Sequence, residues 1–143
     1  MHGVFYEQNW LLQDFDSSHL LEYINKEGDT LKKNIHFPRF QLNTIIPPKW
    51  SGDSMALEIS GLPDNAVLQV MLLDTSYISK GINKDISLKN NMIYLGKEEF
   101  AALKKGPVFL DLLYVDQSSI PEDSEDGGQL FMSYGLRRSF VLE

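Results

Sequence analysis

The 143-residue chain contains no cysteine, which excludes disulfide bonds, thiolate metal sites and cysteine nucleophiles together. Its stability must therefore come from side-chain packing. With 43% hydrophobic residues and a length usual for one domain, the chain is able to bury a core. No apolar run approaches the roughly 18 residues that a membrane-spanning helix needs, so we expect no membrane-spanning segment.

An excess of positive charge is also missing. The formal net charge is −7, which opposes nonspecific attraction to phosphate backbones and anionic lipid headgroups. The basic pairs Lys32-Lys33, Lys104-Lys105 and Arg137-Arg138 are each isolated among acidic or apolar neighbours and are typical of solvated surface charge. We therefore expect no nucleic-acid partner.

Motifs of catalysis are absent as well. The sequence has no G-x-S-x-G elbow, no glycine-rich phosphate loop and no H-E-x-x-H helix. The three histidines, His2, His19 and His36, have no metal-ligand spacing. The sequence therefore predicts no catalytic residue and no cofactor, and it favours a noncatalytic protein.

The N-terminal residues MHGVFYEQNW lack the basic region, apolar region and cleavage site of a signal peptide. Two locations follow from this. The protein is periplasmic or on the cell surface if a leader has been removed, and otherwise it is cytoplasmic.

Three apolar runs predict a β core. Gly106 to Asp116 (GPVFLDLLYVD) opens with Gly-Pro and is expected to be the central strand. Val67 to Asp74 is apolar on both faces, as in an interior strand, and the even positions of residues 130–142 are nearly all apolar. Met55, Leu57 and Ile59 alternate with polar or small residues, which predicts a half-buried strand.

Turn and cap residues predict the remaining elements. Asn90-Asn91 tolerates positive φ and favours a two-residue hairpin that buries Leu88 with Ile93. Asp16-Ser17-Ser18 followed by an apolar stripe and Gly28 predicts a short N-terminal helix. Residues 97–105 predict a helical turn before the central strand, because acidic residues precede basic ones.

This order of segments resembles an immunoglobulin-like or fibronectin-III-like domain. The resemblance spans about residues 35–142 and implies an antiparallel β-sandwich in which 67–74 is strand C. Residues 91–115 resemble strand E, a turn with inward Leu103, and strand F, while 129–142 is similar to strand G. The chain departs from the pattern in having no cysteine pair, no strand C tryptophan and no tyrosine-corner tyrosine. A jelly roll or small barrel is the alternative.

The expected organisation is a single mainly β domain over residues 1–143. Residues 1–34 form an N-terminal segment with the short helix, and residues 35–143 form the sandwich.

Loop residues offer two candidate binding sites. Trp50 and Tyr77 lie in expected loops, where an aromatic ring could bind a sugar or peptide or could instead pack on the edge of the core. Four carboxylates in the loop after the central strand, Glu122, Asp123, Glu125 and Asp126, provide oxygen ligands for Ca²⁺, although the spacing is not that of an EF-hand. The alternative for this loop is a solvated acidic surface.

Asp111 interrupts the central strand as its one polar residue. A buried carboxylate is costly unless it is paired. We therefore expect Asp111 to face solvent or to pair with Arg137 or Arg138.

The sequence favours a noncatalytic β-sandwich that acts as a binding or structural module, with another protein or a glycan as partner, in a bacterial cell envelope or surface protein. Two alternatives stay open. One is a carbohydrate or small-ligand binder that uses loop aromatics. The other is an enzyme with a barrel pocket in which Asp111, His36 and Tyr114 share a cavity.

Overall fold

A computed structural model describes residues 18–24, 28–37, 39–76, 79–119 and 129–143. It divides the chain into two compact units, residues 1–36 and 37–143. Strands make up most of the described residues, and with one short parallel exception they pair antiparallel. The expectation of a mainly β, antiparallel protein is confirmed.

The described part of the first unit is a hairpin of β1 (Ser18–Ile24) and β2 (Thr30–His36), joined by seven residue pairs. The predicted N-terminal helix is therefore wrong. Gly28 does have a positive φ of 91°, but it lies between two strands and not at a helix end. The residues of β1 pair with a neighbouring strand instead of forming a capped helix, and Glu22 forms an ion pair with Lys32 on the opposite strand.

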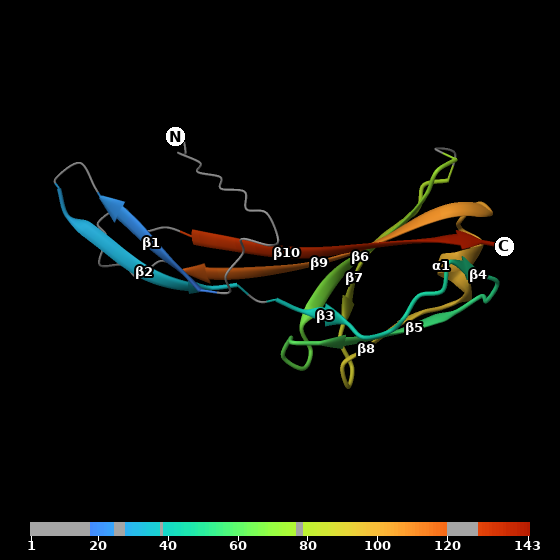
Figure 1. Ribbon diagram of the computed structural model, residues 1–143, viewed down its shortest axis with the longest axis horizontal. Coiled ribbons are helices and arrows are strands. Elements are labelled where there is room, and N and C mark those ends of the chain that lie inside the picture. Colours follow the sequence, from blue (N-terminus) through green and yellow to red (C-terminus); the bar gives the residue numbers. More distant parts are fainter. Residues whose placement is uncertain (1–17, 25–27, 38, 77–78, 120–128) are drawn as a thin grey trace. The chain divides into compact units, whose positions relative to one another are not determined.

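The second unit contains two sheets (Figure 1). The five-stranded sheet has the order β4-β10-β9-β6-β7, formed by β4 (Lys49–Trp50), β6 (Val67–Asp74), β7 (Ile82–Ser87), β9 (Gly106–Ser119) and β10 (Gln129–Leu142). The three-stranded sheet has the order β3-β5-β8, formed by β3 (Gln41–Leu42), β5 (Met55–Ser60) and β8 (Met92–Leu95). As predicted, β9 is the central strand, with β10 on one side and β6 on the other.

Alternating side chains of both sheets fill one core. Met55, Leu57 and Ile59 of β5 are buried, as the alternation predicted. They belong to one hydrophobic cluster with buried residues of the five-stranded sheet, among them Leu68, Val70, Leu72, Val108, Leu110, Leu112, Phe140 and Leu142. The two sheets are therefore held together by apolar burial.

The Asn90-Asn91 turn forms as predicted, with φ values of 51° and 61°. Its strands, however, belong to different sheets, because β7 pairs with β6 and β8 pairs with β5. Only the bridge between Lys89 and Met92 joins the two arms of the turn. The expected hairpin is thus a corner between the sheets. The corner still buries Leu88 and Ile93, as expected.

The helical turn before the central strand is present as α1 (Lys97–Ala101), shorter than the predicted 97–105. Glu99 accepts the Gly96 N–H at 2.6 Å and so satisfies a free donor at the start of the helix. Within the described residues, no helix is long and apolar enough to span a membrane.

Candidate functional site

The two faces of β9 differ in what they contact. Val108, Leu110 and Leu112 point into the core and are at most 1% exposed. Residues between them point to the opposite side of the five-stranded sheet, since side chains alternate along a strand. Cross-strand pairing of Asp111 with Met71 and with Arg137 extends that side over β6 and β10.

We call this side the outer face. It comprises Lys49 of β4, Val67, Gln69, Met71 and Leu73 of β6, Asn83, Asp85 and Ser87 of β7, Pro107, Phe109, Asp111, Leu113, Val115 and Gln117 of β9, and Phe131, Ser133, Gly135, Arg137, Ser139 and Val141 of β10. Of nine large apolar side chains that are exposed in the described part of the chain, five belong to it: Val67 (48%), Leu73 (40%), Val115 (48%), Phe131 (61%) and Val141 (39%). The outer face therefore holds more than half of the large apolar side chains that are exposed in the described residues.

Asp111 lies on the outer face and pairs with one of the two predicted arginines. Arg137 donates two hydrogen bonds to its carboxylate, from Nε at 2.6 Å and from Nη2 at 2.7 Å. The guanidinium also lies 5.4 Å from the centre of the Phe109 ring. Arg138 instead donates to the Arg137 carbonyl oxygen at 2.9 Å. The Asp111 carboxylate raises the pKa of Arg137, so this fixed pair carries no net charge.

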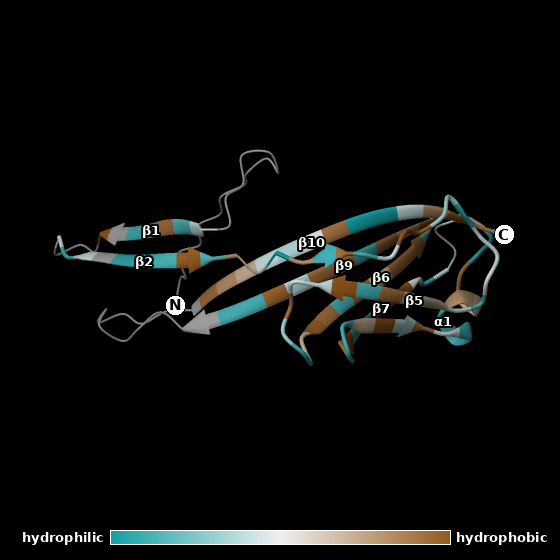
Figure 2. Cartoon of the chain, turned by 60° about the horizontal axis from the view of Figure 1, so that its bottom comes forward, coloured by the Kyte–Doolittle hydropathy of each residue, from teal (hydrophilic) through white to brown (hydrophobic). Residues whose placement is uncertain are grey.

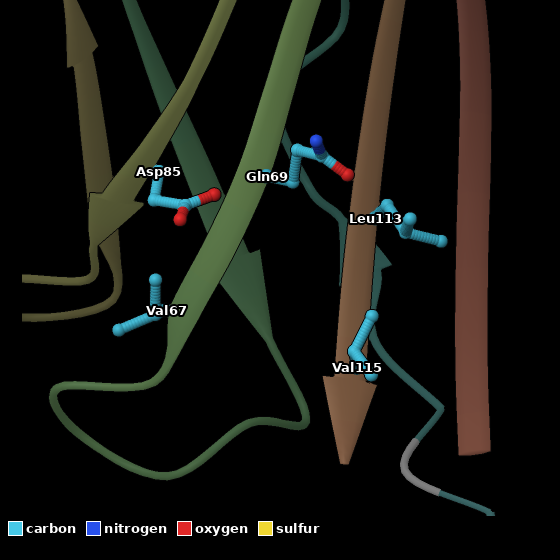
Figure 3. Close-up of a pocket in the computed structure, with 5 residues that line it drawn as sticks. All are labelled: Val67, Gln69, Asp85, Leu113 and Val115. Carbon is cyan, nitrogen blue, oxygen red and sulfur yellow. The ribbon is translucent and has the colours of Figure 1, made fainter. Parts of the chain in front are cut away.

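A hollow of about 350 Å³ opens on the outer face between β7, β6 and β9 (Figure 3). Its apolar lining consists of Val67, Leu113 and Val115, and its polar lining consists of Gln69 and Asp85. The Gln69 amide donates to the Asn83 side chain at 3.0 Å. The Asp85 carboxylate has no hydrogen-bond or ion-pair partner among the described residues.

Trp50 is half-buried in β4, which pairs in parallel with Val141 and Leu142 of β10. Its ring packs against the core, and a Cβ at Gly52 would lie 3.1 Å from it. The indole N–H is buried and has no hydrogen-bond partner in the described structure. This geometry is that of an aromatic ring packed at the edge of the core.

The other loop candidates, Tyr77 and the acidic residues Glu122, Asp123, Glu125 and Asp126, lie outside the described residues. Elsewhere in the described chain, no three His, Asp or Glu side chains come close enough to hold a metal ion.

The two β9 residues of the alternative barrel pocket, Asp111 and Tyr114, lie on opposite faces of the strand. Asp111 points to the outer face, whereas Tyr114 packs against the core cluster. Burial, with a smaller effect from the charge of Asp116, raises the pKa of the Tyr114 hydroxyl. His36 belongs to the other unit of the chain.

Asp74 organises the loops at the far end of β6. Its carboxylate accepts the backbone N–H groups of Lys104 at 2.8 Å and Ser76 at 2.9 Å, as well as the hydroxyls of Ser76 and Ser79. These bonds, the one from Lys104 first, hold the pKa of Asp74 far below its ordinary value. Asp74 therefore joins the loop after β6 to the segment after α1.

A second carboxylate fixes the position of α1. Glu99 forms an ion pair with Lys84 of β7 and accepts the Gly96 N–H. The hydrogen bond from Lys84 is the main reason why the pKa of Glu99 lies below its ordinary value. Both carboxylates therefore have structural partners and are ionised near neutral pH.

Sequence reasoning did not find Asp74 or the hollow beside Asp85. Asp74 had a local signal, since an aspartate followed by Thr-Ser at the end of a strand is typical of a turn closed by its own side chain. The hollow had none, because its lining comes from three strands whose registers depend on the complete sheet.

Comparison of the chain with protein-family models, curated proteins and solved structures found no match.

Proposed function

We propose that residues 37–143 form a noncatalytic, immunoglobulin-like β-sandwich that binds another protein through the outer face of its five-stranded sheet. One observation carries this proposal: exposed large apolar side chains concentrate on that face. Apolar patches on a solvent-exposed face are typical of protein contact sites, because burial of their surface favours association.

The strand order supports the immunoglobulin-like assignment. If β5 and β8 correspond to strands B and E, and β6, β9 and β10 to strands C, F and G, then β3-β5-β8 and β10-β9-β6 reproduce the division of such a domain into two sheets. The short α1 then occupies the connection between strands E and F, where the sequence predicted it.

The noncatalytic assignment is supported by the hydrogen bonds of Asp74 and Glu99. Both carboxylates accept hydrogen bonds from fixed donors, and these bonds lower the pKa of each. A carboxylate whose ionised form is stabilised in this way is a poor general acid or base at neutral pH. Turnover of any substrate in a broad hydrolase panel would overturn this assignment.

The binding proposal is tested with the double variant Val67→Lys/Val115→Lys, which places two charges on the outer face. The matched control is Ile45→Lys/Tyr94→Lys, which makes the same charge change at exposed apolar positions (90% and 64%) outside that face. Wild type and both variants are used to capture proteins from the source organism. Each protein whose capture depends on the face is then purified and titrated calorimetrically.

The outer-face variant is expected to weaken that purified partner's affinity by about tenfold or more, because charge is introduced into an apolar contact. The control variant is expected to bind like the wild type. The proposal fails if no captured protein depends on Val67 and Val115, or if both variants weaken binding equally.

A further inference from the structure

The hollow on the outer face has walls of two kinds. Val67, Leu113 and Val115 supply apolar surface from β6 and β9, while Asp85 supplies a carboxylate from β7 (Figure 3). The hollow is open to solvent. Because small molecules are usually bound with most of their surface buried, an open hollow suits one side chain of a docked protein better than a small molecule.

Asp85 is the charged residue of the outer face that has no opposite charge beside it among the described residues. The charged side chains that the five strands place on this face are Lys49, Asp85, Asp111 and Arg137. Lys49 forms an ion pair with Glu143, and Asp111 and Arg137 neutralise each other in a two-bond ion pair. Asp85 has no such partner among the described residues, so the face presents one negative charge beside an apolar surface.

Only some ligand groups fit this combination. An acidic side chain would be repelled by Asp85, and a purely apolar one would leave the carboxylate desolvated and unpaired. A methylated ammonium group is typically bound by aromatic rings, and none of the lining residues is aromatic. Lysine and arginine combine an aliphatic stem with a cationic head, which matches both walls.

We propose that this hollow receives a lysine or arginine side chain of the protein partner, with the stem on Val67, Leu113 and Val115 and the cationic head on the Asp85 carboxylate. This inference rests on the proposed function and adds the chemistry of the contact. It predicts that the partner surface is apolar around one essential basic residue.

The test is a nuclear magnetic resonance titration of the ¹⁵N-labelled full chain with Nα-acetyl-lysine N-methylamide. Nα-acetyl-norleucine N-methylamide is the matched probe, because it has an aliphatic stem and no ammonium group. The protein variants are Asp85→Asn, which removes the charge at nearly constant size, and Asp53→Asn, an exposed aspartate outside the outer face.

The lysine probe is expected to shift the amide signals of β6, β7 and β9 around the hollow in a saturable way. Asp85→Asn is expected to weaken this binding by about fivefold, the upper range for an exposed ion pair, while Asp53→Asn leaves it unchanged. Equal binding of the norleucine probe, an unchanged affinity in Asp85→Asn, or the absence of localised shifts would each overturn the inference.

The purified partner separates this inference from the proposed function. If Val67→Lys/Val115→Lys abolishes partner binding but Asp85→Asn leaves it intact, the outer face binds protein and the basic-residue contact is wrong. If neither set of substitutions weakens the binding of any captured protein, the proposed function fails as well.

Discussion

Asp74 joins two loops through hydrogen bonds that favour its ionised carboxylate. Its pKa in the folded protein lies far below the ordinary value of 3.8. In the unfolded chain the carboxylate regains that ordinary value. Below it, the unfolded state therefore binds more protons than the folded state, and stability falls as the pH falls.

We predict that Asp74→Asn is less stable than the wild type near neutral pH and that the difference shrinks as the pH falls below the ordinary pKa of 3.8. The reason is that the wild type loses the contribution of Asp74 in this range, whereas the amide does not titrate. Urea unfolding at about pH 7 and at about pH 3 measures both differences.

Asp53→Asn is the control for this prediction, because Asp53 is exposed in the loop before β5. It is expected to unfold like the wild type at both pH values. A difference between wild type and Asp74→Asn that stays constant across the range would show that Asp74 acts through its shape and not through its charge.

The ion pair of Asp111 shows what residue types alone can predict about a contact. A lone carboxylate in an apolar strand predicted either a solvent-facing position or an ion pair with Arg137 or Arg138. The choice between the two arginines depends on the register of β9 and β10, which places Asp111 opposite Arg137. Figure 2 shows the polar segment in the second half of β10 in teal. That register is set across a long connection and could not be read from the two residues.

At the scale of elements, the turn that starts at Gly61 requires glycine as its first residue. Gly61 has a φ of 93°, and a Cβ there would lie 2.7 Å from the Arg39 carbonyl oxygen and 3.3 Å from the Phe40 Cα. The backbone atoms of the segment before β3 therefore leave no room for a side chain.

We predict that Gly61→Ala lowers the free energy of unfolding by about 2 kcal/mol, from positive φ and the close backbone contact together. Gly135→Ala is the matched control, because its Cβ would meet Leu113 Cδ1 at 3.5 Å, an ordinary contact, and its φ is not positive. We expect that variant to change stability by less than about 0.5 kcal/mol. Equal losses in urea unfolding of the two variants would contradict this reading of Gly61.

Short-range signals predicted local elements well and misassigned one. The Asn90-Asn91 turn, the β5 alternation and the turn of α1 all depend on neighbouring residues and are present. The residues of β1 also fit a helix pattern, since Leu20 and Ile24 are spaced for either structure. These residues form a strand because they pair with β2, and helix and strand patterns within one segment give no information on such pairing.

At the scale of the whole molecule, hydrophobic runs predicted the middle of the five-stranded sheet but not the division into two sheets. A strand that is apolar on both faces indicated an interior position for β6, and β9 lies beside it. The corner at Asn90-Asn91 sends β8 to the other sheet. A two-residue turn gives no information on that choice, because a hairpin and a corner share its backbone conformation.

Among the described residues, the core cluster lies within one of the two units. Its first member is Phe40 and its last is Leu142, so residues 18–24 and 28–36 of the other unit contribute none of its buried side chains. In its described residues the first unit is a two-stranded hairpin of β1 and β2, and two-stranded hairpins on their own are marginally stable in water. The two units should therefore differ sharply in their ability to fold alone.

We predict that a fragment of residues 37–143 folds cooperatively and keeps the thermal midpoint of the full chain to within about 5 °C, because it retains the whole core cluster. A peptide of residues 18–36 is expected to give the circular dichroism of a largely unfolded chain. Thermal unfolding of the fragment and of the full chain, followed by circular dichroism, measures the comparison. Loss of cooperative unfolding in the fragment would mean that residues 1–36 are required for the sheets to hold together, which the distribution of buried side chains does not predict.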